Sequence, residues 1–366
     1  MRRRGAGPAA LVAESYDLLV GVDTHAASHT YAIVDAATGA LVEHREFPTS
    51  PAGLRRAQDW IDRRTESGTV LVLVDGAGSY GAVLTEQLLA AGLDLAEAPD
   101  ITRQVRHASG KSDLIDAAEL ARAARGLQTS QLRRPRQGGD RTILRVLSAA
   151  RDQMTGERTR TINALTALLR TVDLGVDARR ALSAATIATI AGWRTSTASA
   201  AGTATARTVC RGEAIRLARR VRALDTELAT NHTALTAAVS AQAPELLEVR
   251  GVGPVVAAVV LQAWSHPGRV RSEAAFAALA GVAPLQASSG NTRRHRLNRG
   301  GDRRLNRALY TIALTRLGHD QRTRAYRARR AAEGATKREI IRILKRYISR
   351  ELFRLLNTTQ TSPMTA

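Results

Sequence analysis

The first third of the chain alternates short apolar runs with turns and amphipathic stretches. Three of the runs lie close together, and the short connections between them allow antiparallel pairing. Two later runs alternate with helical segments and should join the same sheet in parallel. The predicted strands are residues 17–23, 30–35, 41–47, 70–75 and 93–98, and the predicted helices are 51–64, 80–91 and 113–125.

This order is that of a ribonuclease-H-like α/β domain, and it would bring four carboxylates together. Asp23 and Asp75 end two strands that would be neighbours in the sheet. Asp113 and Asp116 lie three residues apart at the start of a helix, so they share one helix face. That helix can pack against the carboxyl edge of the sheet, where the four acids would converge.

Two interpretations of the paired aspartates follow from the residues alone. Asp113 and Asp116 would make a favourable acidic first turn for a helix capped by Ser112. Alternatively, carboxylates held so close favour a cation between them. Acids from three separate parts of the chain suit a pair of Mg²⁺ ions about 3.5–4 Å apart, a device that promotes phosphodiester cleavage.

The formal net charge of +21 is distributed unevenly along the chain. Residues 1–128 contain 13 Lys/Arg and 17 Asp/Glu, a net charge of −4. Residues 291–356 contain 20 Lys/Arg and 5 Asp/Glu, a net charge of +15. An acidic N-terminal region before a basic remainder favours a nucleic-acid partner over a merely solvated arginine surface.

Composition excludes several classes of protein. The single cysteine, Cys210, rules out an intramolecular disulfide and a cysteine-based zinc site. No apolar run approaches the roughly eighteen residues that span a bilayer, and the basic N-terminus lacks the apolar core of a signal peptide. We expect a cytoplasmic, nucleoid-associated protein with no membrane partner.

The middle of the chain is dominated by helix-forming sequence. A basic segment at residues 133–139 is interpreted as a linker, and apolar stripes predict long helices over 140–170 and 213–238. Residues 173–211, rich in Ala, Thr and Ser, show no clear pattern. The two long helices favour an antiparallel hairpin, which could be a dimerisation arm or could track a nucleic-acid backbone.

The basic C-terminal region carries two glycine-containing motifs. Gly251-Val252-Gly253-Pro254 is typical of a helix-hairpin-helix turn that can hold a phosphate, and an ordinary tight turn fits equally. Ser288-Ser289-Gly290 is either a plain polar loop or a serine nucleophile among phosphate-binding arginines. Basic helices are predicted over 302–330 and 336–356. Their inward residues are Leu305, Leu309, Ile312 and Leu317, then Ile340, Ile341, Leu344, Tyr347, Ile348 and Leu352.

Taken together, these motifs resemble the DEDD transposases of bacterial insertion sequences, the IS110 type with its bridge-RNA-guided members. The resemblance covers about residues 17–126 and 245–320. The matching motifs are Gly21-Val22-Asp23-x-His25, Asp75-Gly76-x-Gly78-Ser79-Tyr80-Gly81, Gly110-Lys111-Ser112-Asp113-x-x-Asp116-Ala117, Gly251-Val252-Gly253-Pro254, Ala280-Gly281-Val282-Ala283-Pro284, Ser289-Gly290, and Gly301-Asp302 followed by Leu305.

The resemblance implies a transposase that cleaves and exchanges DNA strands with the help of Mg²⁺. It assigns Asp23, Asp75, Asp113 and Asp116 as metal ligands. It also implies that Ser289, or alternatively Ser288, attacks DNA and forms a transient phosphoserine link. The family position that matches Asp75 is usually glutamate, and the shorter aspartate puts the metal spacing and full activity in question. The nucleic-acid-binding candidates are Lys111, Arg293, Arg294, Arg296, Arg299 and Arg303.

The family further implies a guide RNA that pairs with donor and target DNA, and assembly as a homodimer or tetramer. We expect an α/β RuvC-like N-terminal domain and all-α middle and C-terminal regions with a helix-hairpin-helix-like element. The expected divisions are a disordered arm (1–16), the RuvC-like metal-binding domain (17–128), a linker and long-helix region (129–242), a basic transposase domain with the serine loop (243–356) and a disordered tail (357–366). Two alternatives stay open: a RuvC-like Mg²⁺-dependent nuclease that hydrolyses DNA with water, and an inactive nucleic-acid-binding relic.

Overall fold

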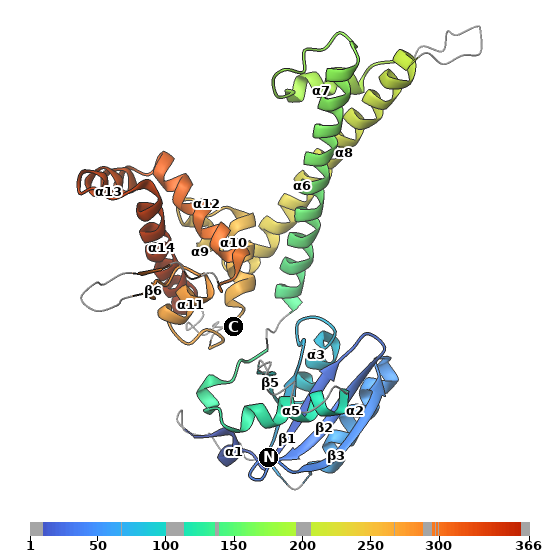
Figure 1. Ribbon diagram of the computed structural model, residues 1–366, viewed down its shortest axis with the longest axis vertical. Coiled ribbons are helices and arrows are strands. Elements are labelled where there is room, and N and C mark those ends of the chain that lie inside the picture. Colours follow the sequence, from blue (N-terminus) through green and yellow to red (C-terminus); the bar gives the residue numbers. More distant parts are fainter. Residues whose placement is uncertain are drawn as a thin grey trace. The chain divides into compact units, whose positions relative to one another are not determined.

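The computed structural model describes residues 10–66, 68–99, 113–135, 139–194, 206–266, 268–287, 295–296, 298 and 300–359. The chain divides into two compact units, Met1–Gln137 and Gly138–Ala366, which we describe separately. The predicted fold class is confirmed, since an α/β unit precedes a helical one (Figure 1). Among the described residues, no helix is both long and apolar enough to cross a membrane. The finer division at residues 128 and 242 stays a prediction.

The first unit is built on a mixed five-stranded sheet with the strand order β3-β2-β1-β4-β5. The pairs β1–β2 and β2–β3 are antiparallel, and the pairs β1–β4 and β4–β5 are parallel, as predicted. The strands are β1 (Leu18–Thr24), β2 (Ser28–Asp35), β3 (Leu41–Pro48), β4 (Val70–Val74) and β5 (Asp94–Glu97).

Helices cover both faces of this sheet, so its central strands are buried on both sides. On one face, α2 (Pro51–Arg64) and α3 (Ala82–Ala90) pack against side chains such as Val20 and Val22 of β1. On the other face, α5 (Asp113–Arg125) packs against a cluster that includes Leu19. The alternation of side chains along β1 therefore assigns each residue to one helical layer.

The structure of the N-terminal arm differs from the prediction. Residues Val12–Ser15 form the short helix α1, whereas disorder was predicted over residues 1–16. Val12 is fully buried in the α5-side core, and its backbone N–H donates to the Leu127 carbonyl at 2.9 Å. A short apolar segment thus gains order from packing that its own sequence does not reveal. Residues 1–9 lie outside the described part of the chain.

The second unit begins with the predicted pair of long helices, α6 (Gly139–Thr171) and α8 (Ala206–Gln242) (Figure 1). Asn231 donates to the Leu147 carbonyl at 2.9 Å, and Arg220 pairs with Glu157 at 2.7 Å. Because the numbering runs in opposite directions along the two helices, the pair is antiparallel. The stretch without a clear pattern contains the short helix α7 (Ala184–Ala191).

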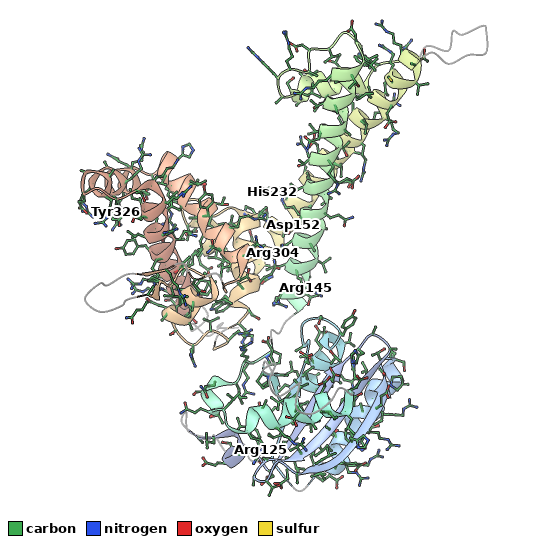
Figure 2. All side chains as sticks on the ribbon, in the orientation of Figure 1. Arg125, Arg145, Asp152, His232, Arg304 and Tyr326 are labelled. Atoms are coloured by element: carbon green, nitrogen blue, oxygen red, sulfur yellow. The ribbon has the colours of Figure 1, made fainter. Side chains whose placement is uncertain are left out.

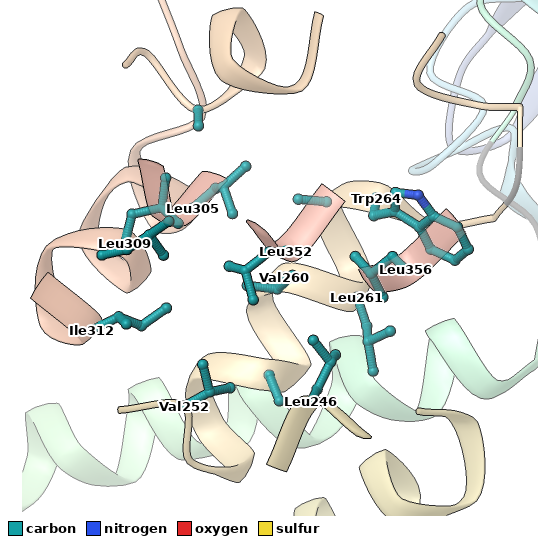
Figure 3. Close-up of a cluster of buried hydrophobic side chains, with 14 of the residues drawn as sticks. Leu246, Val252, Val260, Leu261, Trp264, Leu305, Leu309, Ile312, Leu352 and Leu356 are labelled. Carbon is teal, nitrogen blue, oxygen red and sulfur yellow. The ribbon is translucent and has the colours of Figure 1, made fainter. Parts of the chain in front are cut away.

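The remaining helices of this unit enclose its largest apolar core (Figure 3). Trp264, Leu309 and Leu352 are among its buried members. All four residues predicted to point inward from the first basic helix are buried, namely Leu305, Leu309, Ile312 and Leu317. The helices are α9 (Glu245–Glu248), α10 (Pro254–Trp264), α11 (Glu273–Leu279), α12 (Arg303–His319), α13 (Gln321–Ala332) and α14 (Lys337–Thr359).

Two predictions for the basic helices were wrong. The single helix expected over 302–330 is interrupted at Asp320, which caps α13 by accepting hydrogen bonds from the Thr323 N–H at 2.8 Å and its hydroxyl at 2.6 Å. Aspartate is a strong helix N-cap, so the Asp320 side chain starts α13, while the extended backbone of Asp320 ends α12. Tyr347, predicted to point inward, is 51% exposed and stacks edge-on against Tyr326.

A two-glycine turn joins the short helix α9 to α10, at the place where the sequence predicts a helix-hairpin-helix-like element. Gly251 has a positive φ of 86° and lies close to α12, where an added Cβ would be 3.2 Å from the Ile312 carbonyl oxygen. Arg316 of α12 donates to the Arg250 carbonyl at 2.8 Å. The turn is therefore held by packing on α12, and phosphate binding there stays a prediction.

Gly301 is expected to be far less tolerant of substitution than its neighbour Gly300. A Cβ at Gly301 would lie 2.3 Å from the backbone nitrogen of Gly281, whereas at Gly300 the nearest atom is 3.5 Å away. We expect Gly301→Ala to cost on the order of 2–3 kcal/mol of unfolding free energy. Gly300→Ala should stay within about 0.5 kcal/mol. Thermal unfolding of the two variants measures this, and equal melting temperatures would contradict the close backbone contact.

Candidate metal centre

Asp23 and Asp75 lie side by side at one edge of the sheet. β1 and β4 run parallel, and the Asp75 backbone N–H donates to the Val22 carbonyl at 3.0 Å. Alternation along the strands puts Asp23 on the face of Leu19, and it puts Asp75 on the face of Leu73. Both leucines belong to the core beneath α5. The two carboxylates therefore emerge on the side of the sheet that α5 covers.

Gly21 lets α5 lie unusually close to β1. A Cβ at Gly21 would lie 1.9 Å from the Ala117 carbonyl oxygen and 3.1 Å from the Ala121 nitrogen. The contact face of α5 is correspondingly lined with alanine. Since small residues leave no side chain to separate helix from strand, the first turn of α5 brings Asp113 to the strand end that carries Asp23.

Two arginines fix the other end of α5. Arg122 donates from Nε to the Gly39 carbonyl at 3.0 Å, and Arg125 donates from Nε to the Ala36 carbonyl at 2.7 Å (Arg125 is labelled in Figure 2). Both carbonyls lie in the connection between β2 and β3. These bonds restrict sliding of the helix along the sheet, so the position of its acidic first turn is determined at both ends.

Three side chains converge where α5 meets β1. The His25 Nε2 atom lies 3.2 Å from Asp23 Oδ2 and 3.7 Å from Asp113 Oδ1. One ligand atom from each residue lies within 4.8 Å of the other two, a spacing that could hold a metal ion. His25 opens the turn between β1 and β2, where its backbone N–H donates to the Ser28 carbonyl at 3.2 Å.

His25 was not among the residues predicted for the site. Its signal was present in the Asp23-x-His25 spacing, because residues two apart along an extended chain point to the same side. The imidazole now lies beside carboxylates from two separate elements. Only the packing of α5 on Gly21 reveals that Asp113 is the second partner.

Burial raises the pKa of Asp23 above its ordinary value of 3.8. The nearby His25 lowers the pKa of this carboxyl, whereas the negative charges of Asp116 and Asp75 raise it further. Asp23 is only 8% exposed, so water does little to stabilise its charge. A carboxylate crowded by other carboxylates in this way is stabilised by a bound cation.

Asp75 and Asp116 lie at the margin of this cluster. They are not in the group of three ligand atoms found among the described residues, but their charges act on Asp23. The Asp75 carboxylate is exposed and accepts the Gly76 N–H at 2.8 Å, at a turn where Gly76 has a positive φ of 55°. Their assignment as metal ligands stays a prediction.

The donor set fits a divalent cation. Carboxylate oxygens are the ligands that Mg²⁺ and Mn²⁺ prefer, whereas an imidazole nitrogen is favoured by softer transition metals. Asp23 and Asp113 can therefore serve as ligands of a hard cation, with His25 as a hydrogen-bond partner that holds the carboxylates in place.

The other predicted site residues belong to the second unit or lie outside the described residues. Ser288, Ser289, Lys111, Arg293, Arg294 and Arg299 are among those that the structure does not describe. Arg296 is exposed on β7 (His295–Arg296), which pairs antiparallel with β6 (Leu285–Gln286). Arg303 is exposed at the start of α12. In the sequence, Ser288 and Ser289 lie between β6 and β7, the two strands of this hairpin.

Comparison with known proteins agrees with this architecture. A family model for the DEDD transposase of IS110 matches residues 20–173, and a model described as "Transposase IS116/IS110/IS902 family" matches residues 243–328. The first match spans the sheet and the candidate metal centre. The second spans the region that contains both β6 and β7.

Two similar proteins align over nearly their whole lengths. The "Insertion element IS900 uncharacterized 42 kDa protein" of Mycobacterium paratuberculosis is 29% identical over 375 residues, which cover 89% of this chain and 92% of the relative. The "Insertion element IS110 uncharacterized 43.6 kDa protein" of Streptomyces coelicolor is 28% identical over 390 residues, which cover 94% and 95%. With both family models matched in order, the chain belongs to the IS110 family of DNA transposases.

Proposed function

We propose that the chain cleaves and exchanges the DNA strands of an insertion sequence by combining a metal-bound acidic cluster with a serine nucleophile. The observation that carries the proposal is the convergence of Asp23, His25 and Asp113 within 4.8 Å. Acidic clusters at the carboxyl edge of such a sheet suit phosphodiester chemistry, because a divalent cation there can bind a phosphate oxygen.

The proposed metal is Mg²⁺, held by Asp23 and Asp113 with Asp75 and Asp116 beside them. When bound, it would lower the cost of negative charge on the reacting phosphate. Two elements of the chain would hold the ion in place: α5 supplies Asp113, and β1 supplies Asp23. Asp75, one methylene shorter than the family's usual glutamate, would reach less far toward a shared ion.

The proposed nucleophile is the hydroxyl of Ser289, with Ser288 as the alternative. Its Oγ would form a bond to the phosphorus as the bond to one bridging oxygen breaks. The serine hydroxyl would give its proton to water, and the leaving oxygen of the DNA would take up a proton from water, so no net proton is gained or lost. Arg293, Arg294 and Arg296 would bind the flanking phosphates as charge-assisted donors. In strand exchange, the hydroxyl of another DNA strand would attack the phosphoserine link and release the serine, so the DNA is resealed without a free end.

Replacing Ser289 with alanine is expected to abolish the covalent protein–DNA adduct and to leave nucleic-acid binding within about twofold, since a removed hydroxyl carries no charge. The measurement is denaturing electrophoresis after incubation with labelled element-junction DNA, the candidate end-derived RNA and Mg²⁺. Ser288→Ala is the matched control and should keep the adduct. The opposite pattern would move the nucleophile to Ser288.

A hydrolytic nuclease is the second candidate, because the acidic cluster is assembled within the first unit alone. Cleavage by the double variant Ser288→Ala, Ser289→Ala, with no adduct at any time, would support hydrolysis by water. Binding without cleavage under every condition would instead support an inactive relic.

We also propose a guide RNA and a homodimer or tetramer as the working assembly. The charge of the second unit and the long helix pair of α6 and α8 are compatible with both. Recovery of a defined RNA with the purified protein, and the mass of the complex in solution, would test them.

A further inference from the structure

A strongly basic pocket lies within the second unit, bounded by α12, α14 and the turn at Gly281 and Gly301. Its volume is about 1290 Å³. Seven lysine and arginine side chains line it, against one carboxylate among its described lining residues, that of Asp152. That carboxylate lies 2.9 Å from Arg304 and 3.8 Å from Arg307 (Asp152 and Arg304 are labelled in Figure 2). Most of the positive charge in the pocket is therefore left unbalanced.

Lys345 is the buried member of this group. It is 8% exposed, and its ammonium donates to the Asn306 side-chain oxygen at 2.9 Å. Asn306 is oriented in turn by donating to the Ala280 carbonyl at 2.7 Å. Among the described residues, no carboxylate forms an ion pair with Lys345. Buried lysines are almost always paired, so an anion is the partner that this position lacks.

The choice of lysine at this position is itself informative. The chain has 54 lysines and arginines, of which only Lys111, Lys337 and Lys345 are lysines. Two of the three line this pocket. An ammonium is a compact point charge, whereas a guanidinium is a wide planar fork. In a chain that otherwise uses arginine, lysine at 345 fits a confined contact with one anionic oxygen.

Two further observations point to a ligand. A smaller cavity of about 120 Å³, lined also by Pro284 and Arg296 near the β6–β7 hairpin, shares Arg342 and Lys345 with the large pocket. The Nε atom of Arg304 is buried and has no hydrogen-bond partner among the described residues. Cations spread along one open pocket suit several phosphates in a row better than a single small ion.

We propose that this pocket binds the phosphodiester backbone of a nucleic-acid strand, with Lys345 and Arg342 contacting phosphate and Asn306 positioning the Lys345 ammonium. The inference rests on the family's action on DNA and does not depend on the serine nucleophile. DNA and RNA share this backbone chemistry, so both are tested as sources.

The test measures binding of the full-length chain to labelled duplex DNA, single-stranded DNA and single-stranded RNA across a salt series without Mg²⁺. Lys345→Met and Arg342→Gln are each expected to weaken binding roughly five- to tenfold and to reduce the salt slope by about one. Arg63→Gln removes the same charge from an exposed site on α2 of the first unit, outside the pocket, and it should change affinity less than twofold.

Asn306→Asp separates positioning from a merely structural role. A carboxylate at 306 would pair with the Lys345 ammonium but could no longer donate to the Ala280 carbonyl, so the melting temperature should change little while binding weakens to the level of Lys345→Met. If Asn306 had only a structural role, the affinity of Asn306→Asp for nucleic acid would fall only as far as its melting temperature falls. If Lys345→Met does not fold, Arg342→Gln and Asn306→Asp decide the question.

Of duplex DNA, single-stranded DNA and single-stranded RNA, the probe whose binding is weakened most by the pocket substitutions is the source of the phosphates. The inference would be overturned if every folded pocket variant had the same salt slope and the same affinity as Arg63→Gln. Because binding is measured without Mg²⁺, failure of the proposed adduct would leave this result unaffected, and the two failures are distinguishable.

Discussion

Asp23→Asn is expected to reduce metal-dependent DNA cleavage by roughly a thousandfold or more, while raising the melting temperature of the metal-free protein. Loss of a ligand that supports several kcal/mol of charge stabilisation gives an effect of this order. The stability change has the opposite sign because burial and the charges of Asp116 and Asp75 disfavour the ionised Asp23. Asparagine has a similar shape and cannot ionise, so it removes that unfavourable charge.

The gain in stability depends on pH in a direction set by the raised pKa of Asp23. Without metal, the native state holds this proton more tightly than the unfolded chain, whose aspartate has a pKa near 3.8. Stability is therefore lost as the pH rises from 3.8 through the native pKa, and the full loss persists above it. The advantage of Asp23→Asn should be largest at neutral pH and should vanish below pH 3.8.

Asp59→Asn is the matched control, since Asp59 is an exposed aspartate of α2 in the same unit. It should leave both cleavage and melting temperature unchanged. Added Mg²⁺ should raise the melting temperature of the wild type and have little effect on Asp23→Asn. Retained cleavage, or a lower melting temperature in the metal-free variant, would refute a cation site at Asp23.

Gly21→Ala is expected to lower stability and cleavage together. The added Cβ would lie 1.9 Å from the Ala117 carbonyl oxygen, so α5 or β1 must shift by more than an ångström. Overpacking of a rigid backbone contact costs about 3 kcal/mol or more. The same shift would move Asp113 away from Asp23 and separate the ligand atoms. Thermal unfolding and the cleavage assay measure the two effects.

Gly78→Ala provides the control for this substitution. Gly78 is exposed, and a Cβ there would meet nothing within 4 Å. We expect a change of less than about 0.5 kcal/mol and full cleavage activity. A Gly21→Ala protein as stable as Gly78→Ala would mean that the helix is not held against the strand at this point.

Much of the first unit could be predicted because its signals are local. The sequence predicts Asp23 beside Asp75 from three local signals: apolar runs of strand length, short connections and the rule for parallel strands. Helix α5 begins and ends at the predicted residues, Asp113 and Arg125. The contact of His25 with Asp113 could not be derived in this way, because it depends on how closely α5 approaches β1.

In the second unit, two predictions failed for different reasons: a local capping signal was missed at Asp320, and tertiary packing decides the position of Tyr347. The polar sequence around Asp320 resembles that of its neighbours, yet the backbone of Asp320 ends α12 and its side chain caps α13. Tyr347 fits the apolar stripe of α14, but its side chain lies exposed against Tyr326. The bonds that link Lys345, Asn306 and Ala280 join residues far apart in the chain, and no spacing reveals them.

The candidate metal centre draws its side chains from the end of β1, the turn after it and the start of α5, and Asp75 at the end of β4 lies at its margin. A growing chain that has completed β4 carries Asp23 and Asp75 but not yet Asp113. Such a chain has no helix to hold a third carboxylate at the sheet edge. The candidate metal centre is therefore complete only once α5 has been synthesised and packed on β1, and a chain that ends before residue 113 lacks one of its three converging side chains.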